Sequence, residues 1–449
     1  MTLPNGTQTT YQYDPASQVT QILHQLTATS TQINQAAYAY NPVGNRTSLT
    51  DRRGSQSFGY DNLDRLTSAS HPLLATPQAF AYDPVGNRTT GGSVVNAGNQ
   101  LTADANFSYQ YDDNGNLTRK TLLATGNYSQ YTYDAENRLT KVEEFAAGNP
   151  TAVATSTYRY DGLGRRIEKV ANGQTKRYVY DGEDILLEYD SANVLQARYT
   201  HGPGIDEPIA VTKSGSTFFY HQDGLGTVTD LTDSAGSTAK SYAYDAYGTI
   251  VDQTGTVDQP YSYTGRELDS ETGLMYHRAR YYDPRNGRFL QKDPLRFING
   301  ANLYIYTMNN PANFADPLGL WRNPSDIYKD AMDDAEKSGL PGQHNGLQDA
   351  YRHCLASCML TRENSEFEAE LLGWANEEGG DWLHNQEQGE READELNNAC
   401  GRRFGQTAAS TKDCQGSCRN ATLNGTLRTY QQGTTPTYWS RRIDSLLPY

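Results

Sequence analysis

The stretch YSYTGRELDSETGLMYHRARYYDPRNGRFLQKDPLRFINGANLYIYTMNNPANFADPLGL, residues 261–320, closes one kind of sequence and precedes another. Of the 33 tyrosines in the chain, five lie after Leu320, whereas all four tryptophans and all five cysteines lie there. Such a change in composition predicts a domain boundary directly after the DPLGL sequence at residues 316–320. We call residues 261–320 the closing segment.

Upstream of the closing segment, a unit of two aromatic residues followed by Asp recurs about every twenty to twenty-seven residues, which indicates a repeat array. YQYDPASQVTQI at Tyr11 and YTYDAENRLTKV at Tyr131 are two copies. Alternating aromatic and polar residues before a tight turn predict a β-hairpin, and such hairpins must stack edge to edge into a long spiralling sheet. We interpret the repeated aspartates as turn formers without a catalytic role: Asp14, Asp61, Asp83, Asp112, Asp134 and Asp161.

Composition narrows the class of protein. The hydrophobic fraction is 36%, so amphipathic tyrosines are expected to supply much of the buried surface. The net charge is −15, and an acidic surface disfavours broad binding to phosphates, so nucleic acid is not favoured as a partner. The amino terminus lacks the pattern of a signal peptide, and no apolar run reaches the length of a transmembrane segment.

Three motifs in the closing segment, GLMYHRARYYDPRNGRFLQKDP, NLYIYTMNNP and DPLGL, resemble the core of RHS and YD-repeat proteins. The resemblance implies a mainly β fold, in which repeat hairpins form a spiralling shell that encloses a tail. It divides the chain into a repeat shell (1–219), an RHS-associated core that plugs the shell (220–320) and a variable tail (321–449). Because the sequence starts in mid-repeat, we expect it to be a fragment of a longer repeat protein.

The same resemblance implies an aspartyl protease that cuts its own chain after the terminal leucine. The cut would fall between Leu320 and Trp321, and the catalytic carboxylates would be Asp293 and Asp316. Two adjacent carboxylates cannot both ionise, so one acts as acid while the other activates water. Many relatives carry arginine where this chain has Lys292, which puts the efficiency of cutting in doubt. The alternative is that both Asp-Pro pairs are turn formers in a plug that never cuts.

Two arginines of the core, Arg280 and Arg288, are candidates to orient the two carboxylates. Salt bridges that only stabilise the core explain both residues equally well. The sequence does not decide between these roles.

The tail reads as a small α-helical domain. Periodicity predicts helices at residues 326–337, 346–364, 365–378 and 382–405. The second helix places Asp349, Arg352 and His353 on one face, and the fourth groups further polar residues: Asp394, Asn397, Asn398 and Arg402. QDAYRHC and DELNNACGR resemble paired motifs in helical tails of bacterial polymorphic toxins.

Three interpretations of these polar residues stay open. A hydrolase would use His353 as base, oriented by Asp349, with Arg352 or Arg402 holding an anionic group. A metal site would join His353 to His344 or His384 and to one of the two aspartates, but the histidines lack HExxH spacing, so no metal is assigned. The third interpretation is capping and interhelical contacts. No cofactor is predicted.

The cysteines follow a C-x3-C pattern twice, at Cys354 and Cys358 and at Cys414 and Cys418, with Cys400 left over. Facing helices with this pattern can form two disulfides, which suits a tail that reaches an oxidising periplasm. A zinc site and free buried thiols are the alternatives, and spacing alone does not decide.

Taken with the resemblance, these features predict an RHS-type polymorphic toxin, secreted or delivered into competing bacteria. The resemblance also implies a cognate immunity protein and a secretion apparatus, type VI or similar, as partners. The alternatives are a membrane-disrupting tail without enzymatic activity and a structural or adhesive surface protein with an inert tail. The acidic residues between Glu363 and Glu395 argue against membrane insertion.

Overall fold

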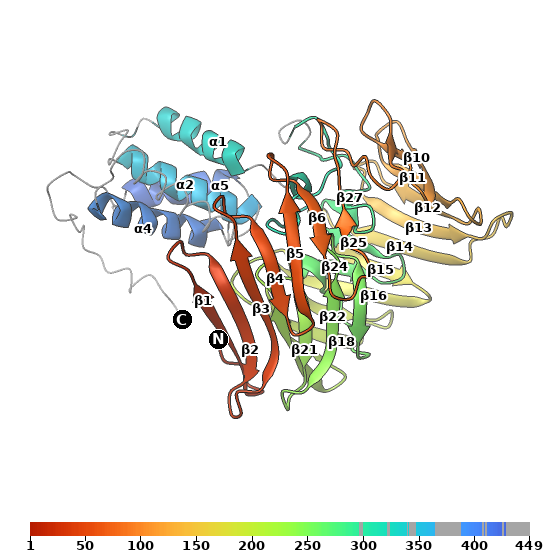
Figure 1. Cartoon of the computed structure of the whole chain (residues 1–449), viewed down its shortest axis with the longest axis horizontal. Coiled ribbons are helices and arrows are strands. Elements are labelled where there is room, and N and C mark those ends of the chain that lie inside the picture. The colour runs from red at the N-terminus through yellow and green to blue at the C-terminus, as the bar shows by residue number, and fades with distance from the viewer. Residues whose placement is uncertain are drawn as a thin grey trace. The chain divides into compact units, whose positions relative to one another are not determined.

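The computed structural model describes residues 1–295, 300–320, 324–338, 340, 347–363, 388–405, 408, 411–423 and 426–427, with the backbone alone for 324–326, 362–363 and 388–396. It divides the chain into two compact units (Figure 1). The first unit holds Met1–Asp14 and Gln18–Trp321, and the second holds Arg322–Tyr449 with Pro15–Ser17.

Most of the first unit consists of two antiparallel sheets, which we call the repeat sheets. One has seven strands among the described residues: β1 (Thr7–Tyr13), β2 (Val19–Leu26), β3 (Gln32–Tyr40), β4 (Arg46–Asp51), β5 (Gly54–Tyr60), β6 (Leu66–Ser70) and β7 (Gln78–Ala79). The other has sixteen: β8 (Val94–Val95), β9 (Leu101–Ala103), β10 (Phe107–Tyr111), β11 (Leu117–Leu122), β12 (Tyr128–Tyr133), β13 (Leu139–Phe145), β14 (Ala154–Tyr160), β15 (Arg166–Ala171), β16 (Gln174–Asp181), β17 (Asp184–Tyr189), β18 (Leu195–His201), β19 (Pro208–Lys213), β20 (Ser216–Gln222), β21 (Val228–Thr232), β22 (Thr238–Tyr244) and β23 (Ile250–Thr254).

Within both repeat sheets every strand pairs with its neighbour in sequence. This arrangement confirms the predicted stacking of hairpins, because a unit of strand, tight turn and strand repeats without any crossover. The predicted boundary between residues 219 and 220 falls inside β20, so the sheet continues through it.

The Tyr-Asp motif explains the turns. In the repeat at Asp134, the backbone N–H of Asp134 donates to the carbonyl of Arg138 at 3.0 Å, and Asp134 Oδ1 accepts from the backbone N–H of Arg138 at 2.9 Å. Between them Asn137 adopts a φ of 61°, a conformation that Gly and Asn tolerate. The same carboxylate bond to the fourth residue onward confirms the predicted role of the repeated aspartates: Asp14, Asp61, Asp83, Asp112, Asp134 and Asp161.

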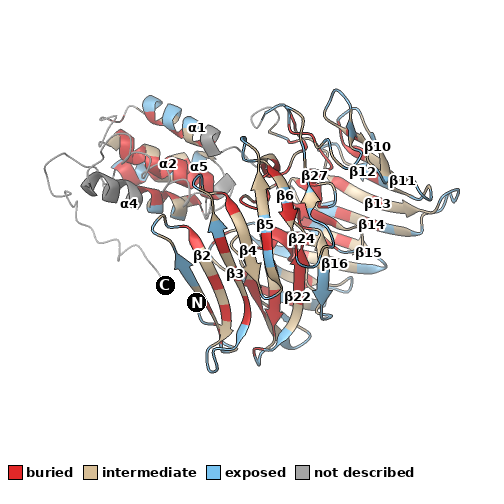
Figure 2. Cartoon of the chain, viewed as in Figure 1, coloured by how far each residue is buried: buried red, intermediate tan, exposed pale blue. Residues whose placement is uncertain are grey.

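At Asp61, Asp83, Asp134 and Asp161 the preceding tyrosine ties its repeat to the previous one. The hydroxyl of Tyr60 donates to the backbone carbonyl of Arg46 at 2.6 Å, and that of Tyr133 donates to the carbonyl of Leu117 at 2.8 Å. The same bond recurs at Tyr40, Tyr82, Tyr160, Tyr180 and Tyr244. The first aromatic ring of the unit is buried instead, as in Tyr158. Buried and partly buried positions therefore alternate along the strands (Figure 2).

In its described residues the closing segment contributes a four-stranded antiparallel sheet and two 3-10 turns. Its elements are β24 (Glu267–Asp269), β25 (Leu274–His277), β26 (Arg280–Asp283), β27 (Arg288–Phe289), η1 (Tyr263–Gly265) and η3 (Thr307–Asn309). Both faces of this sheet are buried against the repeat sheets. Tyr276 and Tyr281 share a core with Tyr109 and other residues from β9–β14, whereas Met275 and Tyr282 share a core with residues from β16–β22. Two cores thus meet on one small sheet.

The second unit is helical in its described part: α1 (Pro324–Lys337), α2 (Leu347–Glu363), α4 (Gln388–Gly405) and α5 (Thr411–Leu423). Three of the predicted helices coincide with α1, α2 and α4, and the helix predicted at 365–378 lies outside the described residues. The short, polar α5 was not among the predicted helices. Of the helices described, none is long and apolar enough to span a membrane.

Two glycines bring α4 close to α2. A Cβ atom at Gly401 would lie 2.1 Å from the carbonyl oxygen of Cys354, and one at Gly405 would lie 2.4 Å from that of Cys358. Only glycine permits this distance between helix backbones. The backbone of α2 at Cys354 and Cys358 therefore lies directly against α4, and both cysteines are fully buried.

Two buried histidines of the first unit make its stability depend on pH. Burial lowers the pKa of His24 to about 4 and that of His221 to about 3. The unfolded chain takes up protons near pH 6.5, and the folded chain does so only at lower pH, so acid favours unfolding. We expect the free energy of unfolding to fall by about 2 kcal/mol per histidine between pH 7 and 4.5. Denaturant titrations followed by near-ultraviolet circular dichroism measure this change.

The variant His221→Gln provides the control, because it removes one of the buried histidines whose pKa is lowered. Its free energy of unfolding should change less over the same pH range than that of the parent. An equal free energy of unfolding for the parent at pH 7 and 4.5 would contradict the prediction.

Candidate site at the end of the closing segment

The structure brings Asp293 and Asp316 together on one arginine. Nη2 of Arg280, the first residue of β26, lies 3.0 Å from Oδ2 of Asp293 and 3.3 Å from Oδ2 of Asp316. All three side chains are buried, and the Asp316 side chain has no exposed surface. Two carboxylates that are 23 residues apart in sequence therefore share a single guanidinium group.

A second set of bonds holds the chain immediately before the predicted cut. The tip of the β25–β26 hairpin, residues 277–280, lies along residues 316–319, and each of its four residues donates to one backbone carbonyl. The donors and acceptors are His277 Nδ1 to Asp316 (2.6 Å), Arg278 Nη1 to Pro317 (2.5 Å), Ala279 N to Leu318 (3.1 Å) and Arg280 Nε to Gly319 (2.6 Å). We call these four bonds the carbonyl ladder.

Two features fix the last residues of the ladder. A Cβ atom at Gly319 would lie 2.4 Å from the carbonyl oxygen of His277, and Gly319 has a φ of 67°, so glycine is required there. The backbone N–H of Leu320 donates to Oδ1 of Asp316 at 2.9 Å. The Asp316 carboxylate thus contacts both Arg280 and the residue whose carbonyl belongs to the predicted scissile bond. Trp321, on the other side of that bond, lies outside the described residues.

His277 was not singled out in the sequence, although it stands in the YHRARYYD motif. Its Nδ1 must carry the proton, because its partner is a carbonyl oxygen. Burial first, and then the nearby charge of Arg266, lower its pKa well below the usual value, so the ring is neutral. The ring lies edge-on to Tyr282, Phe289 and Tyr306.

Of the two arginines considered as orienting groups, the structure places only Arg280 on the carboxylates. Arg288 donates instead to Oδ1 of Asn87 at 3.1 Å and to the backbone carbonyl of Asn99. Lys292 lies beside Gly115: a Cβ atom added to Gly115 would lie 2.3 Å from Cε of Lys292.

The polar residues of α2 form a compact group in the second unit. Arg352 Nη2 lies 2.5 Å from Oδ1 of Asp349 and 2.8 Å from Nε2 of His353. Asp349 and His353 are buried, and their own closest atoms are 3.7 Å apart. The predicted face therefore exists, but the arginine stands between the carboxylate and the imidazole.

The polar residues of α4 are only partly visible. Asn397 and Asn398 are buried, and Oδ1 of Asn398 accepts from the Ser357 hydroxyl on α2 at 3.1 Å. Arg402 is half-buried. The side chain of Asp394 and the residues His344 and His384 lie outside the described residues. Among the residues described, no group of three His, Cys, Asp or Glu could hold a metal ion.

The four cysteines of the C-x3-C pairs join α2 to α5. Disulfides link Cys354 to Cys418 and Cys358 to Cys414, which makes α2 and α5 antiparallel neighbours. Cys400 remains a thiol, and burial raises its pKa to about 11. A thiol with this pKa is protonated and unreactive at neutral pH.

The two disulfides predict a specific labelling pattern. Protein purified from an oxidising compartment and denatured without reductant should take up one alkyl group, at Cys400, because the other four cysteines are paired. After reduction all five cysteines should react. Intact mass with and without reductant counts the groups, and the variant Cys400→Ser is the control that should take up none before reduction. Five labels before reduction would contradict the pairing.

With this geometry in place, comparison with known proteins identifies the family. A family model described as Teneurin YD-shell matches residues 74–312, and one described as RHS Repeat matches residues 40–73. The chain belongs to the YD-shell family. The mainly β fold of its first unit, built from paired repeats, agrees with that membership.

Curated relatives of this YD-shell protein include named toxins. It is 40% identical over 241 residues to the tRNA3(Ser)-specific nuclease WapA of Bacillus spizizenii, which covers 52% of this chain and 10% of that protein. It is 32% identical over 323 residues to double-stranded DNA deaminase toxin A of Burkholderia cenocepacia. That match covers 63% of this chain and 22% of the deaminase toxin. It is 29% identical over 260 residues to toxin protein Tse5 of Pseudomonas aeruginosa. That match covers 50% of this chain and 19% of Tse5. The chain therefore spans a tenth to about a fifth of the length of these relatives.

Among solved structures, the crystal structure of TcdB2-TccC3-TEV is similar to this YD-shell protein with a TM-score of 0.58. The match has 22% sequence identity and covers 71% of this chain and 18% of the other. It supports the fold. Two of the named relatives act on tRNA or DNA according to their names, so the comparisons give no support to the prediction that nucleic acid is not a partner.

Proposed function

We propose that this YD-shell protein is part of an RHS-type polymorphic toxin whose repeat sheets and closing segment enclose a tail and cut it free after Leu320. The observation that carries the proposal is the meeting of Asp293 and Asp316 on Arg280, at the start of the carbonyl ladder. A dyad of carboxylates beside an ordered peptide segment supports hydrolysis of the chain's own backbone, because the substrate is already held in place.

The charge of the site supports an acid–base division of labour. Two carboxylates and one guanidinium group carry no net charge when the pair of carboxylates holds one proton, and a neutral site is favoured in a buried environment. In the proposed reaction the ionised carboxylate takes a proton from water, and the water oxygen bonds to the carbonyl carbon of Leu320. The protonated carboxylate gives its proton to the nitrogen of Trp321 as the C–N bond breaks.

Cleavage can be measured directly by intact mass. The purified parent chain is expected to yield a fragment that begins at Trp321, and Asp293→Asn and Asp316→Asn are each expected to slow its appearance at least a thousandfold, because each loses one of two groups that act as a unit. Asp161→Asn is the matched control: it changes a turn aspartate, and the repeat at Asn41 already carries asparagine in that place.

Three results would contradict the proposal of self-cleavage. They are an uncut parent chain, a fragment that begins elsewhere, and cleavage of either dyad variant at the rate of the parent. Equal slowing by Asp161→Asn would indicate a loss of folding instead.

We further propose that the tail is the effector and acts as a hydrolase at the group formed by Asp349, Arg352 and His353. Burying a carboxylate and an imidazole beside a half-buried guanidinium group on one helix costs free energy, which proteins accept most often at functional sites. The names of the relatives make tRNA and DNA the first substrates to assay. A cognate immunity protein and a secretion apparatus complete the proposal.

Expression of residues 321–449 in the cytoplasm and in the periplasm of a test bacterium separates the alternatives. Growth arrest that is lost in His353→Gln and Asp349→Asn, and retained in the control Asp330→Asn on the exposed side of α1, is the expected result. Dye release from liposomes that does not depend on His353 would favour the membrane-disrupting alternative. Normal growth in both compartments would favour the inert tail.

A further inference from the structure

Arg278 occupies a backbone conformation that ordinarily belongs to glycine. It is the first residue of the two-residue turn between β25 and β26, and its φ is 57°. For a bulky residue this left-handed conformation is strained, and such strain is retained most often where the side chain has a functional role. The contacts of the Arg278 side chain indicate what that role is.

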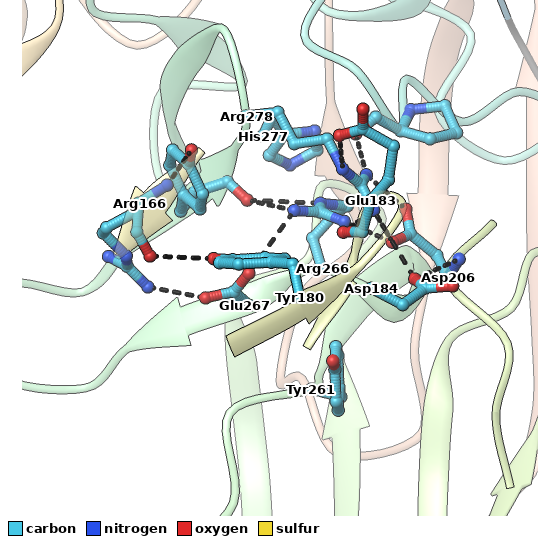
Figure 3. A network of polar contacts seen from close by, with 12 residues as sticks. Arg166, Tyr180, Glu183, Asp184, Asp206, Tyr261, Arg266, Glu267, His277 and Arg278 are labelled. Carbon is cyan, nitrogen blue, oxygen red and sulfur yellow. Dashed lines mark hydrogen bonds and ion pairs between the residues drawn. The ribbon is translucent and has the colours of Figure 1, made fainter. Parts of the chain in front are cut away.

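The guanidinium group of Arg278 binds both the chain before the predicted cut and an acidic cluster of Glu183, Asp184 and Asp206. Figure 3 shows Arg278 beside this cluster. Nη1 donates to the carbonyl of Pro317 at 2.5 Å and to Oδ2 of Asp206 at 3.1 Å, and Nη2 donates to Oδ1 of Asp206 at 2.7 Å. Nη2 also donates to the backbone carbonyl of Glu183 at 3.1 Å. The contact with Asp206 is bidentate, which fixes the plane of the guanidinium group and therefore the direction of its bond to Pro317.

The acidic cluster belongs to the larger repeat sheet. Glu183 and Asp184 lie at the turn between β16 and β17, and Asp206 lies in the loop between β18 and β19. Burial and the neighbouring Asp206 raise the pKa of Asp184 to about 6, which indicates a crowded acidic environment. Asp206 also binds Arg266 of the closing segment, which donates to the carbonyl of Tyr276. Asp206 thus connects the repeat sheet, through two arginines, to the carboxyl-terminal end of β25.

We infer that Arg278 is a positioning residue for self-cleavage, and that Asp206 holds it in place from the repeat sheet. The inference rests on the proposed self-cleavage and adds a requirement to it. Arg280 contacts both carboxylates, whereas Arg278 holds the Pro317 carbonyl, one residue after Asp316. Cutting therefore requires β16–β19 to be folded against the closing segment, because only then is the second bond of the carbonyl ladder formed. The chain cuts itself after its shell strands are in place.

The test measures the rate at which the tail fragment appears during cell-free synthesis of the full chain. Arg278→Gly removes the side chain and suits the φ of the turn, so the hairpin keeps its backbone conformation. We expect it to slow cleavage at least tenfold. The cleavage rate of Arg278→Lys should lie between those of Arg278→Gly and the parent, because lysine keeps the charge but not the bidentate contact. Asn172→Gly is the matched control, since Asn172 has a φ of 51° in an exposed turn of the repeat sheet.

A double-mutant cycle identifies Asp206 as the partner. Asp206→Asn should slow cleavage, and the double variant with Arg278→Gly should be no slower than the slower single variant, because both remove the same link. Additive slowing would overturn the assigned role of Asp206.

A second measurement does not depend on cutting. In the uncut Asp293→Asn chain, Arg278→Gly should raise amide hydrogen exchange in residues 316–320 at least tenfold and leave β16–β19 unchanged. Parent-like cleavage together with unchanged exchange would overturn the inference. A parent chain that is never cut would refute self-cleavage itself, and is recognised without any Arg278 variant.

Discussion

The repeat sheets depend on one hydrogen bond, from a tyrosine hydroxyl to a backbone carbonyl of the preceding repeat. A chain with a hydrophobic fraction of 36% cannot fill an extended sheet with aliphatic side chains. Tyrosine supplies a large apolar ring and a donor at its tip, so it packs against the neighbouring repeat and satisfies a carbonyl there. The next residue, an aspartate, closes the turn with its carboxylate. Two adjacent residues therefore act together in these repeats: the tyrosine bonds to the preceding repeat, and the aspartate closes the turn of its own repeat.

The closing segment is held by a different kind of interaction, the buried ion pair between arginine and carboxylate. Arg266 and Arg280 of this segment are almost fully buried, as is Arg166 of β15, and each pairs with carboxylates. Buried pairs of this kind add less stability than apolar packing, but they tolerate only one arrangement of the chain. The fold accepts this cost at the closing segment, where two of these arginines also hold backbone carbonyls in place.

Much of the first unit follows from the sequence, since the repeat period, the turn residues and the aromatic alternation are local. The proximity of Asp293 and Asp316 was expected from a family resemblance, and the structure brings them together. Local patterns could not choose between Arg280 and Arg288, because that choice depends on which loop each strand faces. The carbonyl ladder was missed for the same reason: its partners are separated by 39 residues and two of its donors are ordinary core arginines. In the tail, α5 was missed because its sequence is polar and its burial depends on two disulfides.

The carbonyl ladder lies wholly on the amino-terminal side of the Leu320–Trp321 bond. Hydrolysis of that bond would leave every one of its hydrogen bonds intact, so the new carboxyl terminus would stay beside Asp293 and Asp316 as a bound product. Such a centre turns over once and then blocks itself. It cannot attack other chains, and a protein that carries it needs no separate inhibitor for its own protease.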